Sequence, residues 1–167
     1  MYKNKNNNIT EIVELYGNNF IGKTSYAISL INKNDIALYI DVDNKLNNNI
    51  EYPINMYIYR DNNISNIHEF IKKSIHCLDI IIIDSLPNIC NDKNIYNLQY
   101  DFSIFKTIRE IISLCKKYNC KLVIVNQLRK NKDNKKKSFG IRALGLYYTK
   151  RIHILDNNKV IITKNLH

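Results

Sequence analysis

Two of the four glycines in this chain, Gly17 and Gly22, are followed by Lys23 and Thr24 in the pattern G-x-x-x-x-G-K-[ST]. In this pattern, backbone amides of a tight loop converge on phosphate oxygens, the lysine reaches the β- and γ-phosphates, and the threonine hydroxyl binds Mg²⁺. A helix that begins at Lys23 adds its positive end to the same anion site. A strand–helix turn that contains these residues by chance is the alternative, but chance matches are rare in a chain with so little glycine. The residues expected to contact a nucleotide are Gly17, Asn18, Asn19, Phe20, Ile21, Gly22, Lys23, Thr24 and Ser25.

A carboxylate for the metal is expected at Asp84, which ends the apolar run 80–83. An acid in this place holds Mg²⁺ beside the phosphates, together with the Thr24 hydroxyl. A solvated cap at a strand end is the alternative for an isolated acid. The presence of the glycine loop in the same chain favours the metal role.

Short runs rich in β-branched residues alternate with helical patterns. The runs at 80–83 and 122–125 are apolar at consecutive positions, as in strands covered on both faces of a parallel sheet. The Asn157-Asn158 pair lies between the last two runs and predicts an antiparallel hairpin at the sheet edge. The sequence thus predicts an α/β fold: a mainly parallel central sheet flanked by helices. The expected strands are 11–16, 36–41, 55–60, 79–84, 121–126, 151–156 and 159–164, and the expected helices are 23–31, 64–78 and 104–115.

The bulk properties predict one domain, residues 9–167, after a disordered tail of residues 1–8. The formal charge of +10 favours a polyanionic partner, although lysine enrichment from an AT-rich genome is an alternative source. No apolar run is long enough to span a bilayer, and the polar N-terminus does not resemble a signal peptide. We therefore expect an intracellular protein that is neither secreted nor membrane-bound. Four cysteines without metal-like spacing predict buried free thiols: Cys77, Cys90, Cys115 and Cys120.

The sequence resembles the RecA recombinase family from about residue 9 to its C-terminus. The segments that carry the resemblance occur in the same order as in that family. They are "EIVELYGNNFIGKTS", "ALYIDVDNKLN", "DIIIIDSLPNI", "KLVIVNQLRK", "GIRALGLYYTKRIHI" and "VIITKN". The resemblance implies a single RecA-like P-loop ATPase domain that uses ATP and Mg²⁺, binds single-stranded DNA and associates with DNA in the cell.

The resemblance also assigns catalytic roles to Lys23, Asp43 and Gln127. Asp43 stands where the family has the carboxylate that activates the attacking water, and it is one methylene shorter than the usual Glu, so slow hydrolysis is expected. Gln127 stands where a glutamine senses the γ-phosphate and reports it to the DNA-binding loop. From the residues alone, an ordinary acid after a strand and a polar strand-end cap remain the alternatives.

The basic block 129–137 takes the place of the family's second DNA-binding loop, and Phe139 is expected to stack on bases. A solvated charged loop is the alternative. The residues expected to bind DNA are Arg129, Lys130, Lys132, Lys135, Lys136, Lys137, Phe139 and Arg142. Lys93 and Tyr96 are weaker candidates in the place of the first DNA loop.

The departures from the family concern assembly. From the resemblance, we expect this protein to lack the family's N-terminal polymerisation segment and C-terminal domain. Lys164 matches one of two lysines that reach a neighbouring subunit's nucleotide, but Leu166 holds the place of the other, and Leu146 replaces an aromatic residue at the interface. We expect self-association or a partner recombinase. The leading hypothesis is a recombination or repair ATPase that promotes homologous pairing or strand exchange. The alternatives are a non-catalytic accessory subunit that binds nucleotide and a partner recombinase, and, less favoured, a small-molecule kinase.

Overall fold

A computed structural model describes residues 9–47, 51–89, 98–130, 136–155 and 159–164, and the tail predicted at residues 1–8 lies outside them. The described chain forms one sheet with the strand order β3-β2-β4-β5-β1-β7-β8, and β6 pairs with β5 beside this path. The strands are β1 (Ile12–Gly17), β2 (Ala37–Asp41), β3 (Met56–Tyr59), β4 (Ile80–Asp84), β5 (Lys121–Lys130), β6 (Lys136–Ser138), β7 (Lys150–Ile154) and β8 (Val160–Lys164). The α-helices are α1 (Lys23–Ser29), α2 (Ile64–Ser74), α3 (Leu86–Ile89), α4 (Leu98–Tyr118) and α5 (Ile141–Leu144), and the 3₁₀ turns are η1 (Ile75–Cys77) and η2 (Gly145–Tyr147).

The sheet is mainly parallel, as the sequence predicts. β1 pairs in parallel with β5 and β7, β4 pairs in parallel with β2 and β5, and β2 pairs in parallel with β3. The two antiparallel pairs are β5 with β6 and β7 with β8. The second of these confirms the C-terminal edge hairpin.

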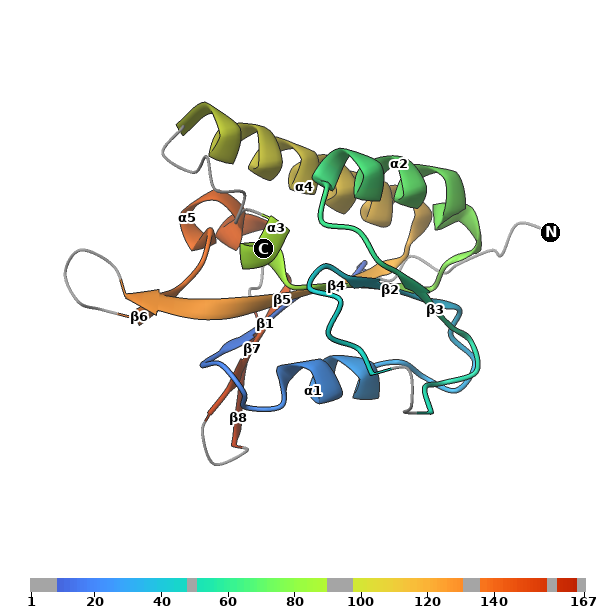
Figure 1. The fold of residues 1–167 in the computed structure, drawn as a ribbon, viewed down its shortest axis with the longest axis horizontal. Helices are drawn as coiled ribbons and strands as arrows, with labels where there is room; N and C mark the ends of the chain where they lie inside the picture. Colours follow the sequence, from blue (N-terminus) through green and yellow to red (C-terminus); the bar gives the residue numbers. More distant parts are fainter. Residues whose placement is uncertain (1–8, 48–50, 90–97, 131–135, 156–158, 165–167) are drawn as a thin grey trace.

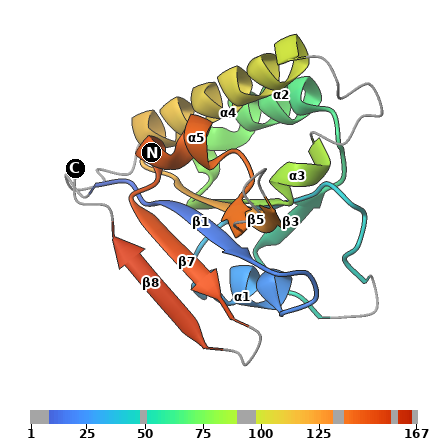
Figure 2. The same cartoon turned by 90° about the vertical axis from the view of Figure 1, so that its left-hand side faces the viewer.

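Helices cover both faces of the sheet, as Figures 1 and 2 show: α1 lies on one face, and α2, α4 and α5 lie on the other. Side chains of β4 alternate between the two layers, so that Ile81 and Ile83 join the core under α2 and α4 while Ile80 and Ile82 join the core under α1. This two-sided burial explains why the run at 80–83 is apolar at every position.

Two elements extend beyond their predicted bounds. The periodic apolar residues at 104–115 mark only the buried middle of α4. Phe102 and Ser103 before it and residues 116–118 after it are exposed and carry no such pattern. β5 continues past residue 126 to Lys130, because β6 pairs with its far end. The basic block 129–137, predicted as a loop, is therefore an antiparallel ladder where it is described.

The prediction of buried thiols is confirmed for two of the three cysteines that the structure describes. Cys115 and Cys120 are buried, but Cys77 is exposed because it lies in η1 at the solvent side of the end of α2. Cys90 lies outside the described residues. Within the described parts of the chain, no helix combines the length and apolar character needed to cross a membrane.

The apolar core under α4 is expected to contribute strongly to the free energy of unfolding. Ile108 is fully buried among the apolar residues of this layer. The change Ile108→Ala should lower the free energy of unfolding by about 3 kcal/mol, because it leaves a cavity that the sheet cannot fill. Urea denaturation measures this loss. The matched control is Ile54→Ala at a side chain that is 95% exposed, where the change should stay within about 0.5 kcal/mol. Equal losses in the two variants would contradict the assignment of this core.

Candidate nucleotide site

The glycine loop connects the end of β1 to the start of α1, as its pattern predicts. A Cβ on Gly17 would lie 2.5 Å from the carbonyl oxygen of Ile154, so only glycine fits where β7 approaches this closely. Gly22 has φ +79°, a left-handed conformation that favours glycine, directly before the first residue of α1. A residue other than glycine would therefore clash with β7 at position 17 and would be strained at position 22.

Lys23 lies inside this loop. Its side chain is only 9% exposed, and its ammonium donates to the carbonyl oxygens of Gly17, at 3.5 Å, and of Asn18. Burial lowers the pKa of Lys23, the Asp84 carboxylate opposes this, and the nearby Lys45 ammonium lowers the pKa further. A buried ammonium with only neutral oxygens as hydrogen-bond partners gains stability when an anion arrives beside it.

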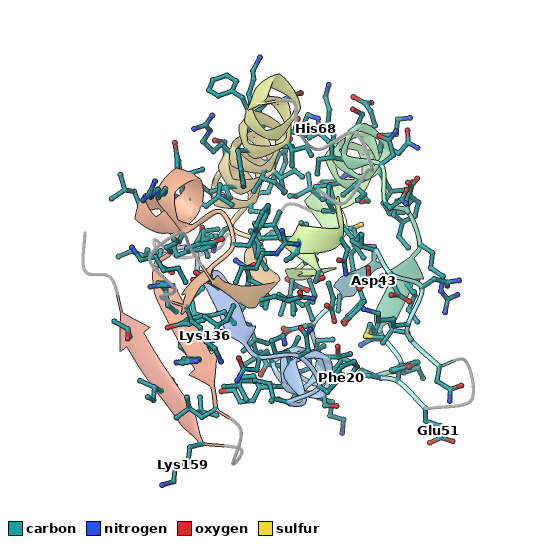
Figure 3. The ribbon with its side chains drawn as sticks, turned by 60° about the vertical axis from the view of Figure 1, so that its left-hand side comes forward. Phe20, Asp43, Glu51, His68, Lys136 and Lys159 are labelled. Carbon is teal, nitrogen blue, oxygen red and sulfur yellow. The ribbon has the colours of Figure 1, made fainter. Side chains whose placement is uncertain are left out.

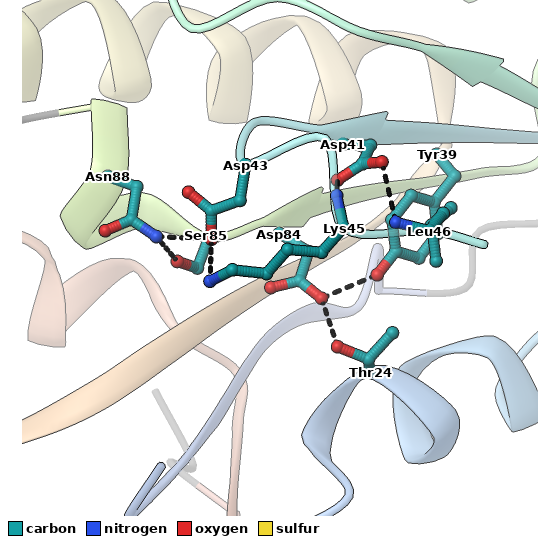
Figure 4. A network of polar contacts seen from close by, with 9 residues as sticks. All are labelled: Thr24, Tyr39, Asp41, Asp43, Lys45, Leu46, Asp84, Ser85 and Asn88. Carbon is teal, nitrogen blue, oxygen red and sulfur yellow. Dashed lines mark hydrogen bonds and ion pairs between the residues drawn. The ribbon is translucent and has the colours of Figure 1, made fainter. Parts of the chain in front are cut away.

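The expected metal ligands come together although they are sixty residues apart in sequence. The Thr24 hydroxyl donates to the Asp84 carboxylate at 2.6 Å, and the Tyr39 hydroxyl donates to the same oxygen at 2.6 Å (Figure 4). Burial and the Asp84 charge raise the pKa of Tyr39 well above its usual range, so this phenol stays a donor.

The pair formed by Thr24 and Asp84 suits Mg²⁺. This ion is usually held by one or two carboxylates together with substrate phosphates, rather than by a protein cage. The described residues contain no cluster of three or more His, Cys, Asp or Glu side chains that would form such a cage. Thr24 and Asp84 are the residues that would hold Mg²⁺ here, where the ion would neutralise charge on nucleotide phosphates.

One acid ends β2 and another lies two residues later, and they have different partners. Asp41 is buried and accepts from the backbone amides of Lys45 and Leu46, each at 3.0 Å, which fixes the turn after the strand. Asp43, the expected catalytic carboxylate, forms an ion pair with Lys45 at 2.6 Å and accepts from the Asn88 side chain (Figure 4). Asp41 is the register partner of Asp84, so the turn that carries Asp43 follows the strand end next to the metal ligands.

Gln127, the expected phosphate sensor, lies on β5 in register with Gly17 of β1. Its backbone amide donates to the Asn126 side chain at 2.8 Å, and its carbonyl accepts from the Phe139 amide at 3.1 Å. The structure therefore places Gln127 beside the start of the phosphate loop and at the base of the β5–β6 hairpin, which carries the basic block.

A buried polar cluster, which the sequence analysis missed, lies under this region. Glu14 is fully buried, and its two oxygens accept from Asn126 at 2.9 Å and from Arg151 at 2.6 Å. Asn126 also donates to the carbonyl of Phe139 at 2.8 Å, and Arg151 donates to the Ser138 hydroxyl at 3.1 Å. We call Glu14, Asn126, Arg151 and Ser138 the Glu14 cluster. The sequence gives one sign of this cluster, since Glu14 is an acid within an otherwise apolar strand. A carboxylate buried in such a strand requires polar partners.

The expected DNA-binding residues divide between exposed and packed positions. Lys137 is exposed and pairs in register with Arg129, and Arg142 is exposed on α5. The Phe139 ring packs 5.9 Å from the Phe105 ring and lies under the Arg129 guanidinium at 4.5 Å. In this conformation Phe139 contributes to packing, and its stacking on bases stays a prediction.

For the remaining expected residues, the structure gives only a position in a strand or no description. Lys130 ends β5, and Lys164 ends β8 opposite Lys150. Lys132 and Lys135, like the weaker candidates Lys93 and Tyr96, lie outside the described residues.

Positive charge also gathers away from the nucleotide loop. An open pocket on the helical face is lined by Lys72 of α2 and by Lys106, Arg109 and Lys117 of α4. The net charge of +10 is thus not concentrated on the β5–β6 hairpin. An argument for DNA binding there must rest on the position of the hairpin rather than on total charge.

Neither a comparison with protein-family models nor a search among curated proteins finds a significant match to this sequence. The geometry above therefore carries the functional argument.

The Glu14 cluster should be a major source of stability. The change Arg151→Ala is expected to lower the free energy of unfolding by about 3 kcal/mol, since it leaves the buried Glu14 carboxylate without its cationic partner. Adding Glu14→Gln to this variant should restore about 1 kcal/mol, because a neutral amide is less costly to bury. Chemical denaturation of the wild type, Arg151→Ala and the double variant measures both effects. If Arg151→Ala unfolds at the same denaturant concentration as the wild type, the Glu14 cluster does not have this role.

Proposed function

We propose that this protein is a RecA-like P-loop ATPase that binds ATP with Mg²⁺, binds single-stranded DNA, and promotes homologous pairing or strand exchange in recombination or repair. The observation that carries the nucleotide part is the 2.6 Å contact between Thr24 and Asp84, which joins the glycine loop to the acid of a buried strand. These two side chains would hold one divalent ion beside the loop. The ammonium of Lys23 lies in the same loop.

Hydrolysis and its coupling to DNA are assigned to the neighbouring strand ends. Asp43 would hold the attacking water, and Gln127 would sense the γ-phosphate and transmit its presence to the hairpin. The support is positional: Gln127 is the register partner of Gly17, and the Gln127 carbonyl holds the amide of Phe139 at the hairpin base. The exposed cations of the hairpin, Arg129 and Lys137, would neutralise DNA phosphates.

A non-catalytic accessory subunit is the second candidate, and the ion pair between Asp43 and Lys45 favours it. The same Asp43 oxygen that pairs with Lys45 also accepts from the Asn88 side chain, so it is occupied and not available to hold the attacking water. In this case the chain would bind ATP, leave it intact, and act through a partner recombinase.

Nucleotide binding is tested with Lys23→Met. At a nucleotide concentration about one hundred times Kd, Mg·ATP should stabilise the wild type by about 2.7 kcal/mol, and the variant should lose this gain. Without nucleotide the variant should be no less stable than the wild type, because it removes an ammonium whose pKa is lowered by burial. Thermal unfolding with and without Mg·ATP measures both. The control is Lys33→Met at an exposed position, which should behave as the wild type. An unstabilised wild type refutes the proposed nucleotide site.

The DNA-coupled activity is tested by measuring phosphate release with and without single-stranded DNA. We expect stimulation by DNA, loss of activity in Lys23→Met, and DNA affinity that falls steeply with salt, with a log–log slope of about −0.7 for each phosphate neutralised. DNA affinity that responds neither to ATP nor to salt would contradict the proposal. Bound ATP that stays intact under saturating DNA would instead select the accessory function.

A further inference from the structure

Lys136, expected above to bind DNA, contacts the phosphate loop. Its ammonium lies 3.2 Å from the Asn18 side-chain oxygen, although the two residues are 118 positions apart in sequence. Lys136 is the first residue of β6, on the returning half of the basic hairpin. In Figure 3, Lys136 and the loop residue Phe20 lie in the same part of the molecule, while His68 lies far from both among the helices.

Buried contacts set the position of this lysine. Ser138, two residues further along β6, is 5% exposed and accepts from Arg151 of the Glu14 cluster. Alternate residues of a strand point to the same face, so Lys136 shares the face of Ser138, and Lys137 points to the opposite one. The ladder with β5 pairs Ser138 with Leu128 and Lys136 with Lys130, which holds the strand in this register. The approach of Lys136 to the loop therefore follows from the anchoring of the hairpin.

Two ammonium groups meet at Asn18. Lys23 donates to its backbone carbonyl, and Lys136 donates to its side chain. An anion bound between two ammonium groups is attracted to both of them. A triphosphate in the loop would be such an anion.

We propose that Lys136 is a nucleotide-contacting residue: with a nucleoside triphosphate in the loop, its ammonium leaves Asn18 and pairs with phosphate oxygens. This inference rests on the proposed nucleotide site and extends it. Because Lys136 belongs to the basic hairpin, its contact draws the hairpin onto the occupied loop. The orientation of Lys137 and Arg129 toward DNA then depends on whether nucleotide is bound. This contact is a second connection between the nucleotide site and the DNA-binding residues, beside the one through Gln127.

The test compares Lys136→Ala with Lys137→Ala, two variants that remove the same charge from adjacent exposed residues on opposite faces of β6. Affinity for a fluorescent ATP analogue with Mg²⁺ is measured in low salt and without DNA. Lys136→Ala should bind the analogue about five-fold more weakly than the wild type, the size of one partly exposed ion pair, and Lys137→Ala should change by less than about two-fold.

A second measurement addresses the coupling. The affinity for single-stranded DNA is measured with and without the nucleotide analogue, and the ratio of the two affinities should shrink in Lys136→Ala. In Lys137→Ala both affinities should fall together, so that the ratio is unchanged.

The outcomes separate this inference from the proposed function. Analogue binding by the wild type, with equal affinities in the two variants, overturns the role of Lys136 and leaves the nucleotide site in place. A wild type that does not bind the analogue overturns both.

Discussion

Burial of the Glu14 carboxylate in the middle of β1 constrains much of this structure. A carboxylate with no exposure to water is tolerated only when its oxygens are paired and hydrogen-bonded, and the partners here come from the strands on both sides of β1. Asn126 comes from β5 and Arg151 comes from β7. Because both partners also bind the residues at the base of the hairpin, Ser138 and Phe139, pairing this one charge fixes the position of four strands relative to one another.

Strand order then determines which residues form the site. β5 lies between β1 and β4, so the carboxyl ends of β1, β5, β4 and β2 lie in a row at one edge of the sheet. In open α/β sheets, ligands bind at this edge because helix N-termini and loops converge there. The glycine loop and the turn with Asp43 follow two of these strands, Asp84 ends a third, and Gln127 lies within β5 where it pairs with Gly17. β5 lies between β1, which leads into the glycine loop, and β4, which ends at Asp84. The contact of Thr24 with Asp84 therefore crosses β5, the strand that carries Gln127.

The β5–β6 hairpin connects this edge to the basic surface. Its base is held by partly buried hydrogen bonds, and Lys136 contacts Asn18 of the glycine loop. The same anchoring explains why Phe139 is packed against Phe105: the residue turns from the ladder into the core under α4. The hairpin thus contacts the glycine loop, the Glu14 cluster and the core under α4.

The sequence by itself determined the local features of this protein. The glycine loop, the apolar strands, the helical stripes and the edge hairpin all follow from short-range rules of backbone conformation and burial, and the structure has them where they were predicted. The tertiary structure decided how far β5 and α4 extend, that Tyr39 serves Asp84, that Glu14 has two partners, and that Lys136 reaches Asn18. Those contacts join residues distant along the chain, and no local pattern encodes them because they depend on strand order and on which face of each strand a side chain occupies.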